Sequence, residues 1–444
     1  MTAVEQQPNV PVSADNLAER LLGAALGAAD ILSIYLGDRL GWYRSLLTDG
    51  PATCGELAER TGTHPRYARE WLEQQAVTGL LTVDSDAPDD PVASGGYPAA
   101  SRRFSLPTAT AEVLTDEHSL AFLAPLPRMF AAAAGQLPAL LEAYRNGGGV
   151  SWKQYGVDAR ESQADMNRPW YERVLPDALR GVTSVDQVLR RPHARIADIG
   201  CGAGWSSIAL ARAYPEASID GFDIDAASIE LARSNAWQSG MSDRIRFHAG
   251  DAVQMPESAY DAVFAFECVH DMPRPVEVLA AARRALVATG TVIVMDEAVA
   301  ESFTAPGDEI ERLMYGFSLL VCLPDGMAHQ PSAATGTVMR LDRLRNYAHD
   351  AGFLDVDVLP IQDFGFWRFY QLSGQGGPDS PRPEVMCGAV AVEHAWEVVQ
   401  TAKVIARWAW PRAISASAVG SRRLLSKLTH HSQKYGQIAP LLLL

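Results

Sequence analysis

The fold of this chain is decided by the stretch Ala197-Asp198-Ile199-Gly200-Cys201-Gly202-Ala203-Gly204. It follows a short apolar run and opens a helical pattern that extends from Ser206 to Arg212. Where a strand passes into a helix, the chain turns tightly and its backbone can approach a ligand, which residues without a Cβ permit. A bare structural turn would also explain three glycines. Their position after a strand is what favours a binding loop.

Short apolar runs alternate with helical stretches from residue 195 onward. This alternation predicts an α/β fold with a parallel, doubly wound sheet. The seven runs are Ile196–Ile199, Ser218–Phe222, Ile245–Ala249, Ala262–Phe266, Thr291–Met295, Val356–Leu359 and Phe366–Gln371. The last two are joined without room for a crossover helix, so they predict an antiparallel hairpin at the sheet edge.

Carboxylates stand where the second and third runs end. Asp223 lies 25 residues after Asp198, near the spacing at which a carboxylate meets the ribose hydroxyls of an adenosine. Asp251 and Ala252 end the third run, where an aspartate could accept a hydrogen bond from the adenine amine. Capping of the following helix is an equal alternative for any single aspartate. Capping does not predict acids at three consecutive strand ends.

The acid at Asp198 distinguishes between two kinds of cofactor. A dinucleotide places its diphosphate against the helix N-terminus. A carboxylate one turn before the loop disfavours phosphate and favours an amino or sulfonium cation. The sequence therefore predicts S-adenosylmethionine, and a nicotinamide oxidoreductase is the competing hypothesis.

Over residues 160–372 the chain resembles class I S-adenosylmethionine-dependent methyltransferases, close to the ubiquinone/menaquinone-type cores. The motifs are Asp198 to Gly204, Asp223, Asp251 and the run Phe266-Glu267-Cys268-Val269-His270-Asp271-Met272. The resemblance implies a Rossmann-like seven-stranded sheet and transfer of a methyl group to an O, N or C nucleophile of a small molecule. It places Gly200, Gly202 and Gly204 at the methionine moiety, Asp223 at the ribose, Ile224 against adenine, Asp251 and Ala252 at its edge, and Glu267 and Cys268 beside the methyl donor.

His270 and Asp271 follow the fourth run, where the methyl acceptor should approach. A histidine there can accept a proton from a hydroxyl or amine, because its unperturbed pKa is about 6.5. The alternative, that His270 only bonds nearby backbone or that Asp271 caps the next helix, weighs equally. Secondary pocket candidates, for which packing or surface roles are favoured, are Asp296, Glu297, Cys322 and His329. No metal site is predicted.

The N-terminal region shows a helix, turn, helix and two-stranded wing pattern. Apolar spacing over residues 15–47 predicts a helix with a buried stripe. Thr53 and Glu56 form a capping box before a short helix, and Pro65 begins the next one. Residues 80–83 and 103–106 predict a pair of strands, which completes a mainly helical winged-helix domain.

Two stretches, Leu36-Gly37-Asp38-Arg39-Leu40 and Glu70-Trp71-Leu72-Glu73-Gln74-Gln75, look like the winged-helix region of bacterial methyltransferases, some of which were labelled regulators. The resemblance implies a homodimer built by this domain. A DNA-binding transcriptional regulator that senses the cofactor is the alternative function. The helix that would serve as the DNA recognition helix carries three basic side chains (His64, Arg66 and Arg69). Nearby glutamates outnumber them, so nucleic acid is disfavoured as a partner.

The composition is that of a folded globular protein. The 444 residues carry a formal net charge of −15, which repels a phosphate backbone. The most apolar window, Leu21 to Leu40, contains Asp30, Asp38 and Arg39, so a membrane span is not expected. The N-terminus lacks signal-peptide form, and five scattered cysteines indicate reduced thiols, which together predict a cytoplasmic protein.

These patterns divide the chain into four regions. Residues 1–107 form the expected dimerisation domain, and residues 108–189 a helical connector that contributes to the substrate pocket. Residues 190–372 form the expected methyltransferase domain. Residues 373–444 form a basic C-terminal extension of unassigned role.

Overall fold

The computed structural model describes residues 13–84 and 102–374. By its internal contacts the chain divides into a unit of residues 1–386 and a unit of residues 387–444. All described residues belong to the first unit. The predictions made for the C-terminal extension lie almost wholly outside the described residues.

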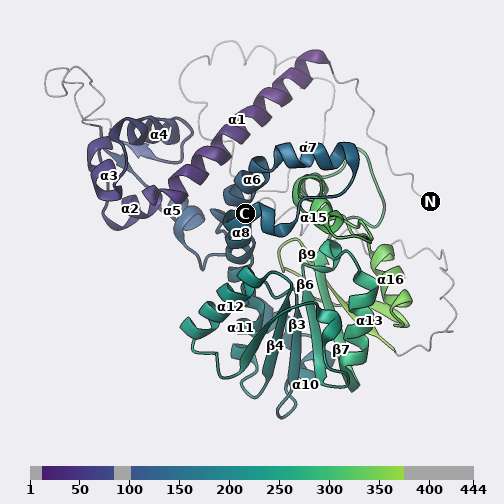
Figure 1. Ribbon diagram of the computed structural model, residues 1–444. Coiled ribbons are helices and arrows are strands. Elements are labelled where there is room, and N and C mark those ends of the chain that lie inside the picture. The colour runs from purple at the N-terminus through teal and green to yellow at the C-terminus, as the bar shows by residue number, and fades with distance from the viewer. Residues whose placement is uncertain (1–12, 85–101, 375–444) are drawn as a thin grey trace, which may run out of the picture. The chain divides into compact units, whose positions relative to one another are not determined.

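A seven-stranded sheet with the order β5-β4-β3-β6-β7-β9-β8 forms the centre of the catalytic region (Figure 1). Its strands are β3 (Arg195–Ile199), β4 (Ser218–Asp223), β5 (Ile245–Ala249), β6 (Tyr260–Phe266), β7 (Leu286–Glu297), β8 (Asp355–Val358) and β9 (Trp367–Ser373). The first five are parallel, and β9 is antiparallel to both β7 and β8. The predicted sheet and its terminal hairpin are confirmed, with β9 between β7 and the edge strand β8.

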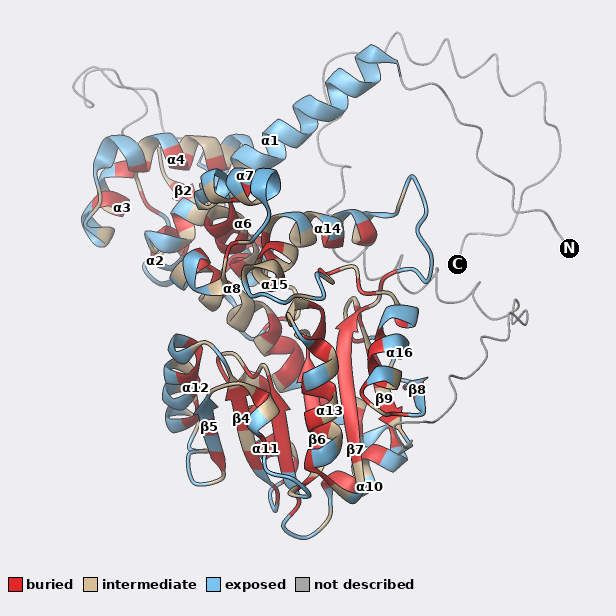
Figure 2. Cartoon of the chain, turned by 45° about the vertical axis from the view of Figure 1, so that its right-hand side comes forward, coloured by how far each residue is buried: buried red, intermediate tan, exposed pale blue. Residues whose placement is uncertain are grey.

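Helices cover both faces of this sheet. One face packs against α9 (Leu175–Arg180), α10 (Thr183–Leu189), α11 (Trp205–Ala213) and α12 (Ala226–Gln238). The other face packs against α13 (Pro275–Ala285) and α16 (Leu341–Asp350). Adjacent residues of β3 alternate between the two cores: Ile196 faces the first, and Ala197 faces the second. Strands buried on both faces explain why the runs read as continuously apolar (Figure 2).

The short elements predicted for the N-terminal region are present. Thr53 caps α3 (Cys54–Thr61) in a capping box with Glu56, and Pro65 begins α4 (Pro65–Val77). β1 (Thr82–Val83) pairs antiparallel with β2 (Phe104–Ser105), both shorter than predicted. The order agrees with a winged-helix outline, and the winged-helix assignment itself stays a prediction.

The long N-terminal helix departs from the prediction in two ways. Gly41, at a φ of 70°, separates α1 (Ala14–Arg39) from α2 (Trp42–Thr48). The expected buried stripe is wrong for most of α1, because Leu21, Leu22 and Leu26 are each more than 60% exposed. Spacing of apolar residues identifies an amphipathic face but not what covers it. Figure 2 shows α1 as exposed over most of its length.

By length and composition alone, α1 is also apolar enough to cross a membrane, and only 6% of its most apolar window is buried. It is the one helix among the described residues that meets this test. The expectations of no membrane span and of a cytoplasmic location therefore stay predictions.

The end of α1 is anchored by side chains of the Leu36–Leu40 stretch. Gly37 lies so close to Trp71 that a Cβ there would be 2.3 Å from a ring atom. Asp38 binds the buried Arg128 through both oxygens, at 2.6 and 3.0 Å, and Arg128 reaches Asp165 at 2.6 Å. The motif therefore ties α1 to the connector.

The connector supplies one wall of the site. Its first four helices, which precede α9 and α10, are α5 (Thr108–Thr115), α6 (Pro125–Gly135), α7 (Leu137–Asn146) and α8 (Trp152–Arg173). An insertion between β7 and β8 supplies another wall, with α14 (Glu309–Phe317), the π-helical turn η4 (Ser318–Cys322) and α15 (Leu323–Ala328). Val150 donates from its backbone to the Pro324 carbonyl at 3.0 Å, so the two walls meet.

Candidate active site

A cleft of about 870 Å³ lies where the carboxyl ends of the strands meet α8 and the insertion. Ten of the predicted site residues line it: Gly200, Gly202, Asp223, Ile224, Asp251, Ala252, Glu267, Cys268, His270 and Asp271. Asp198 and Gly204 do not line it. The position at the strand ends is the one expected for a ligand of an open α/β sheet.

Each glycine of the loop has a positive φ but a different neighbour. A Cβ at Gly200 would lie 2.7 Å from Cys268, and one at Gly204 would lie 2.6 Å from the Phe247 ring. A Cβ at Gly202, where φ is 50°, would meet nothing within 4 Å. Gly200 and Gly204 are therefore required by packing, whereas Gly202 leaves space open on the cleft side.

Asp198 lies beneath the loop and supports it. Its side chain is fully buried and accepts hydrogen bonds from the Ser206 and Ser207 hydroxyls, both at 2.6 Å. Burial raises the pKa of Asp198 to about 6, although the two hydroxyl bonds oppose this. Its other oxygen has no partner among the described residues. The carboxylate thus fixes the first turn of α11 from behind the cleft wall.

Asp223 connects the loop to the next strand. One carboxylate oxygen accepts from the Gly202 amide at 2.9 Å and the other from the Asp225 amide at 2.8 Å. Burial raises the pKa of Asp223, against the lowering effect of these bonds. The adjacent Ile224 is 65% exposed although apolar, which suits a flat, apolar ligand face. Each carboxylate oxygen keeps a second lone pair for ribose hydroxyls.

Asp251 combines a cleft position with a capping role. It accepts from the Val253 amide at 3.0 Å as the cap of the turn η2 (Ala252–Gln254), and it pairs with Arg274 at 3.1 Å. The capping alternative is thus observed for this residue. Its contact with adenine stays a prediction.

Glu267 occupies a strained position after β6. Its φ of 53° is rare for a residue with a Cβ, and such strain persists only where the surroundings enforce it. Two amides on α8, from Asn167 and Gln163, donate to its carboxylate, the latter at 3.1 Å. Burial raises the pKa of Glu267, and the bond from Asn167 opposes this.

His270 is 2% exposed and lies among carboxylates. Its Nδ1 is 2.8 Å from Asp296 and 3.2 Å from Glu297, and its Nε2 is 3.2 Å from Asp271. Burial disfavours the imidazolium, but the three acids outweigh it and raise the pKa of His270 well above its usual value. Burial likewise acts to raise the pKa of Asp296, yet His270 and the adjacent hydrogen bonds lower it. The alternative that His270 bonds only to nearby backbone is therefore wrong, because its ring contacts three carboxylates.

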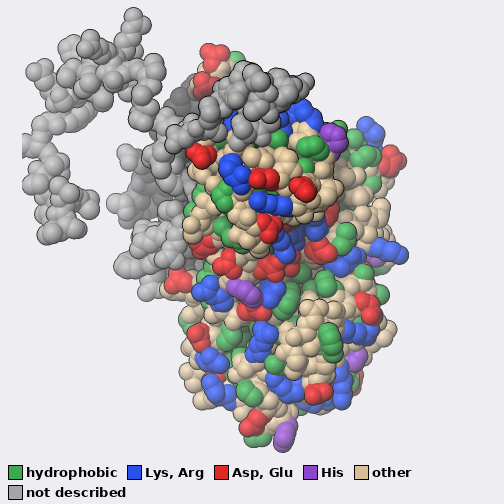
Figure 3. Space-filling model, turned by 90° about the vertical axis from the view of Figure 1, so that its left-hand side faces the viewer, with side chains coloured by type: hydrophobic (Ala, Val, Ile, Leu, Met, Phe, Trp, Pro, Cys, Tyr) green, Lys and Arg blue, Asp and Glu red, His purple; other side chains and the backbone are tan. Residues whose placement is uncertain are grey.

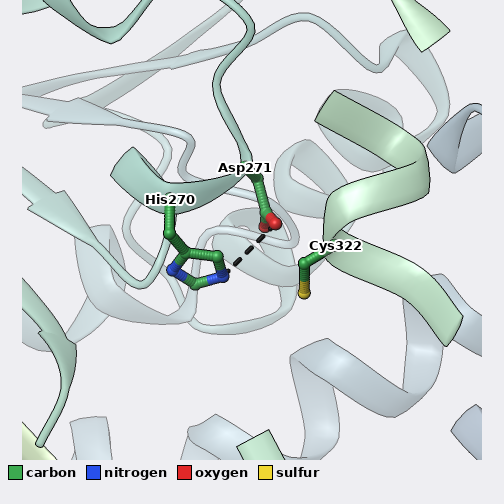
Figure 4. A group of neighbouring side chains, drawn as sticks. All are labelled: His270, Asp271 and Cys322. Carbon is green, nitrogen blue, oxygen red and sulfur yellow. Dashed lines mark ion pairs between the residues drawn. The ribbon is translucent and has the colours of Figure 1, made fainter. Parts of the chain in front are cut away.

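The secondary candidates are closer to His270 than the sequence suggested. Asp296 and Glu297 are both buried at the end of β7 and contact the ring, so a surface role is wrong for them; Glu297 lines the cleft and Asp296 does not. Figure 4 shows Cys322 reaching toward His270 and Asp271 from a different helix. These three residues, and also His270 with Asp296 and Glu297, bring ligand atoms within 4.8 Å of one another, as a metal site could. His329 lines the cleft and is exposed.

Several lining residues carry no sequence signal that singles them out. They are Trp152, Arg160, Gln163 and Asn167 of α8, Met314 and Phe317 of α14, Asp325 of α15, and Thr337. The connector was expected to reach the pocket, and it does. Which of its side chains face the cleft depends on the kink at Gly156, where φ is 78° and ψ is −157°.

The cleft fits S-adenosylmethionine by several observations on these residues. Space is open above Gly202, and an apolar side chain is exposed at Ile224. The strand ends carry acids, which suit a ligand with a sulfonium and an ammonium group. Two arginines and no lysine line the cleft among the described residues, and both arginines are paired: Arg160 with Asp225, and Arg274 with Asp251.

Comparison with known proteins gives the class to which this region belongs. Residues 190–321 match the methyltransferase domain family. The structure of human N-acetylserotonin methyltransferase in complex with S-adenosylmethionine superposes with a TM-score of 0.58 at 18% identity, covering 85% of this chain and 100% of that one. The chain thus contains a methyltransferase domain with the fold of class I S-adenosylmethionine-dependent enzymes, and the predicted fold and cofactor are confirmed.

Two sequence relatives align at higher identity but over a smaller share of this chain. The 27-O-demethylrifamycin SV methyltransferase of Amycolatopsis mediterranei is 29% identical over 160 residues, which cover 35% of this chain and 57% of that enzyme. The N,N-dimethyltransferase OxyT of Streptomyces rimosus is 26% identical over 274 residues, covering 61% of this chain and 76% of that enzyme. The alignment with the rifamycin enzyme therefore spans less than two thirds of its length.

Proposed function

We propose that this protein is an S-adenosylmethionine-dependent methyltransferase that methylates an O or N nucleophile of a small molecule, with His270 as the base. The observation that carries the proposal is the placement of a buried, carboxylate-supported histidine in the same cleft as the glycine loop. The two relatives described above, an O-methyltransferase and an N,N-dimethyltransferase by name, support both acceptor classes.

The cofactor, when bound, supplies a methyl group that its sulfonium already activates. The chain's own residues therefore mainly align the two reactants and exclude water. When the Nδ1–H of neutral His270 donates a hydrogen bond to Asp296, Nε2, which lies 3.2 Å from Asp271, is the nitrogen that can accept the proton of the acceptor hydroxyl or amine. The bound cofactor would supply the methyl group to the acceptor atom, and Nε2 of His270 would take the proton that the acceptor loses.

The first prediction concerns ligand choice. S-adenosylmethionine and S-adenosylhomocysteine should raise the melting temperature, with about 2.7 kcal/mol of stabilisation at a ligand concentration 100 times Kd. NAD should have no effect, because buried Asp198 behind the loop disfavours a diphosphate. Differential scanning calorimetry with each ligand checks this. If NAD alone raised the melting temperature, the methyltransferase proposal would be wrong and the oxidoreductase hypothesis would take its place.

The DNA-binding alternative finds little support in the charges of the N-terminal region. On α4, Arg66 pairs with Glu70 at 2.5 Å and Arg69 with Glu73 at 3.2 Å, so the basic side chains are compensated. On the face drawn in Figure 3, basic and acidic side chains are interspersed. A phosphate backbone requires an uncompensated basic stripe.

We further propose that the N-terminal region forms a homodimer. The exposed leucines of α1 continue into an apolar groove of about 610 Å³ between the end of α1 and α4, lined by Leu36, Leu40, Trp42, Tyr67 and Trp71 among others. An exposed apolar surface of this kind marks a partner surface, and a second copy related by a two-fold axis is the default partner.

The second prediction tests this dimer. Leu22→Glu together with Leu26→Glu should convert a dimer into a monomer in light scattering, because two charges would be buried at the interface. Trp237→Glu on α12 is the control, since Trp237 is 75% exposed but lies on the catalytic region. A monomeric wild-type protein at micromolar concentration, or binding of α1 to lipid vesicles, would contradict the dimer.

A further inference from the structure

The part of the cleft that faces His270 forms a chamber with mostly apolar walls. Its walls come from α6, from the start of α8, from α14 and from the adjoining turn η4 of the insertion: Met129, Trp152, Met314, Phe317 and Val321. Asp271 and Cys322, which lie beside His270 in Figure 4, line the same cleft. If the protein has the proposed function, the methyl acceptor binds in this chamber.

One acid in this chamber is not balanced by a cation. Asp325 accepts a hydrogen bond from the Trp152 amide at 2.6 Å through Oδ1. No basic side chain in the described part of the chain pairs with its carboxylate. A carboxylate facing an apolar chamber without a cation is costly unless a ligand supplies one.

A second acid is close to Asp325. A Cβ built on Gly326 would lie 3.1 Å from the Asp271 carbonyl oxygen, so α15 is pressed against the turn η3 (Val269–Asp271) that carries Asp271. The imidazole of His270 is already shared between Asp271 and the buried acids Asp296 and Glu297, and His329, which ends α15, also lines the cleft. Burial and the neighbouring Asp271 raise the pKa of Asp325 to about 7, so a cation bound beside it would favour its charged form.

Two further features concern the groups that a ligand would meet here. Thr337 is 2% exposed, lines the cleft and adjoins the Cys322 thiol. The ring of Trp152, whose own amide binds Asp325, also lines the cleft and offers an aromatic face, which attracts an organic cation.

We propose that the chamber contains an ammonium subsite at Asp325, so that the methyl acceptor carries a basic amine besides the atom that is methylated. This inference rests on the proposed function. Cys322, which reaches toward His270, and Asp325 are three residues apart on one helical face, a rise of about 4.5 Å. The ammonium group of the acceptor therefore lies a few bonds from the methylated atom.

The alternative role of Asp325 is to cap α8, and the test separates the two. Asp325→Asn keeps an oxygen that accepts from the Trp152 amide but removes the negative charge. Asp308→Asn is the matched control, because Asp308 caps α14 through the Glu311 amide at 2.7 Å and does not line the cleft. Both variants should melt near the wild-type temperature.

The experiment is calorimetric titration of the full chain saturated with S-adenosylhomocysteine. The probes at millimolar concentration are 2-phenylethylamine, the neutral 2-phenylethanol and the anionic phenylacetate. We expect the amine to bind at least about ten-fold more tightly than the alcohol, and the acid least, as a paired carboxylate dictates. Asp325→Asn should abolish the preference, and Asp308→Asn should retain it.

The outcomes distinguish this inference from the proposed function. Failure of S-adenosylhomocysteine to bind would remove the proposed function itself. If S-adenosylhomocysteine binds but the amine does not, or binds no better than the alcohol, the ammonium subsite is overturned and the methyltransferase stands. An amine preference that survives in Asp325→Asn would likewise overturn the assignment to Asp325.

Discussion

Gly202→Val is expected to abolish binding of S-adenosylmethionine while the chain stays folded. Gly202 lines the cleft, and a Cβ there would meet no protein atom within 4 Å, so the added side chain fills the space of the ligand. We expect affinity to fall by about 100-fold or more, since the loop works by close backbone approach. Isothermal titration with S-adenosylhomocysteine measures the change.

The positive φ of Gly202 adds a cost in stability that must be separated from the loss of binding. Gly62→Val is the control, because Gly62 caps α3 at a φ of 64° and also has nothing within 4 Å. Both variants should lose about 1–3 kcal/mol of stability from the left-handed backbone. Only Gly202→Val should lose the cofactor. Equal affinities in the two variants would show that the ligand does not contact this loop.

The sheet could be predicted from the sequence because its strands are buried on both faces. Such strands leave continuous apolar runs bounded by polar ends, and ligand groups at those ends follow from the topology. That is why the sequence alone predicted that Asp223, Asp251 and His270 lie at one cleft. For the glycine loop, its place directly after a strand indicated a binding site, whereas the number of its glycines did not.

The roles of Asp198 and Gly204 could not be separated from those of their neighbours by sequence. Asp198 is the residue before Ile199 on β3, and alternation turns its side chain beneath the loop toward Ser206 and Ser207. Gly204 is needed because Phe247, from β5, packs on it. Contacts between residues so far apart in the chain are set by tertiary packing.

The α8 and insertion residues escaped prediction for a related reason. Asn167, Gln163 and Asp325 belong to helices whose apolar spacing is ordinary, and their orientation follows from how those helices cross the strand ends. The support of His270 by Asp296 and Glu297 could have been inferred more firmly. Both acids end β7, the neighbour of β6 in the sheet, and parallel neighbours bring their ends to one edge.

His270→Ala is expected to lower turnover by about 100-fold or more with little change in affinity for S-adenosylmethionine. Buried Asp296 holds the ring at Nδ1, and Nε2, beside Asp271, is the nitrogen that can accept the proton of the methyl acceptor. Turnover is measured as transfer of labelled methyl groups to an acceptor found by screening extracts. His118→Ala is the control, since the His118 side chain is 65% exposed and outside the cleft.

Removing the imidazole also leaves buried acids without their cation, so His270→Gln and a pH profile accompany the alanine variant. The acids raise the pKa of His270 despite its burial, and only the deprotonated ring is a base. Wild-type kcat should therefore rise as the pH passes through that raised pKa and level off above it. Asp296→Asn removes one of the raising charges and should move the rise to lower pH. A base role is contradicted if the profile does not move, or if His270→Ala loses cofactor affinity as strongly as turnover.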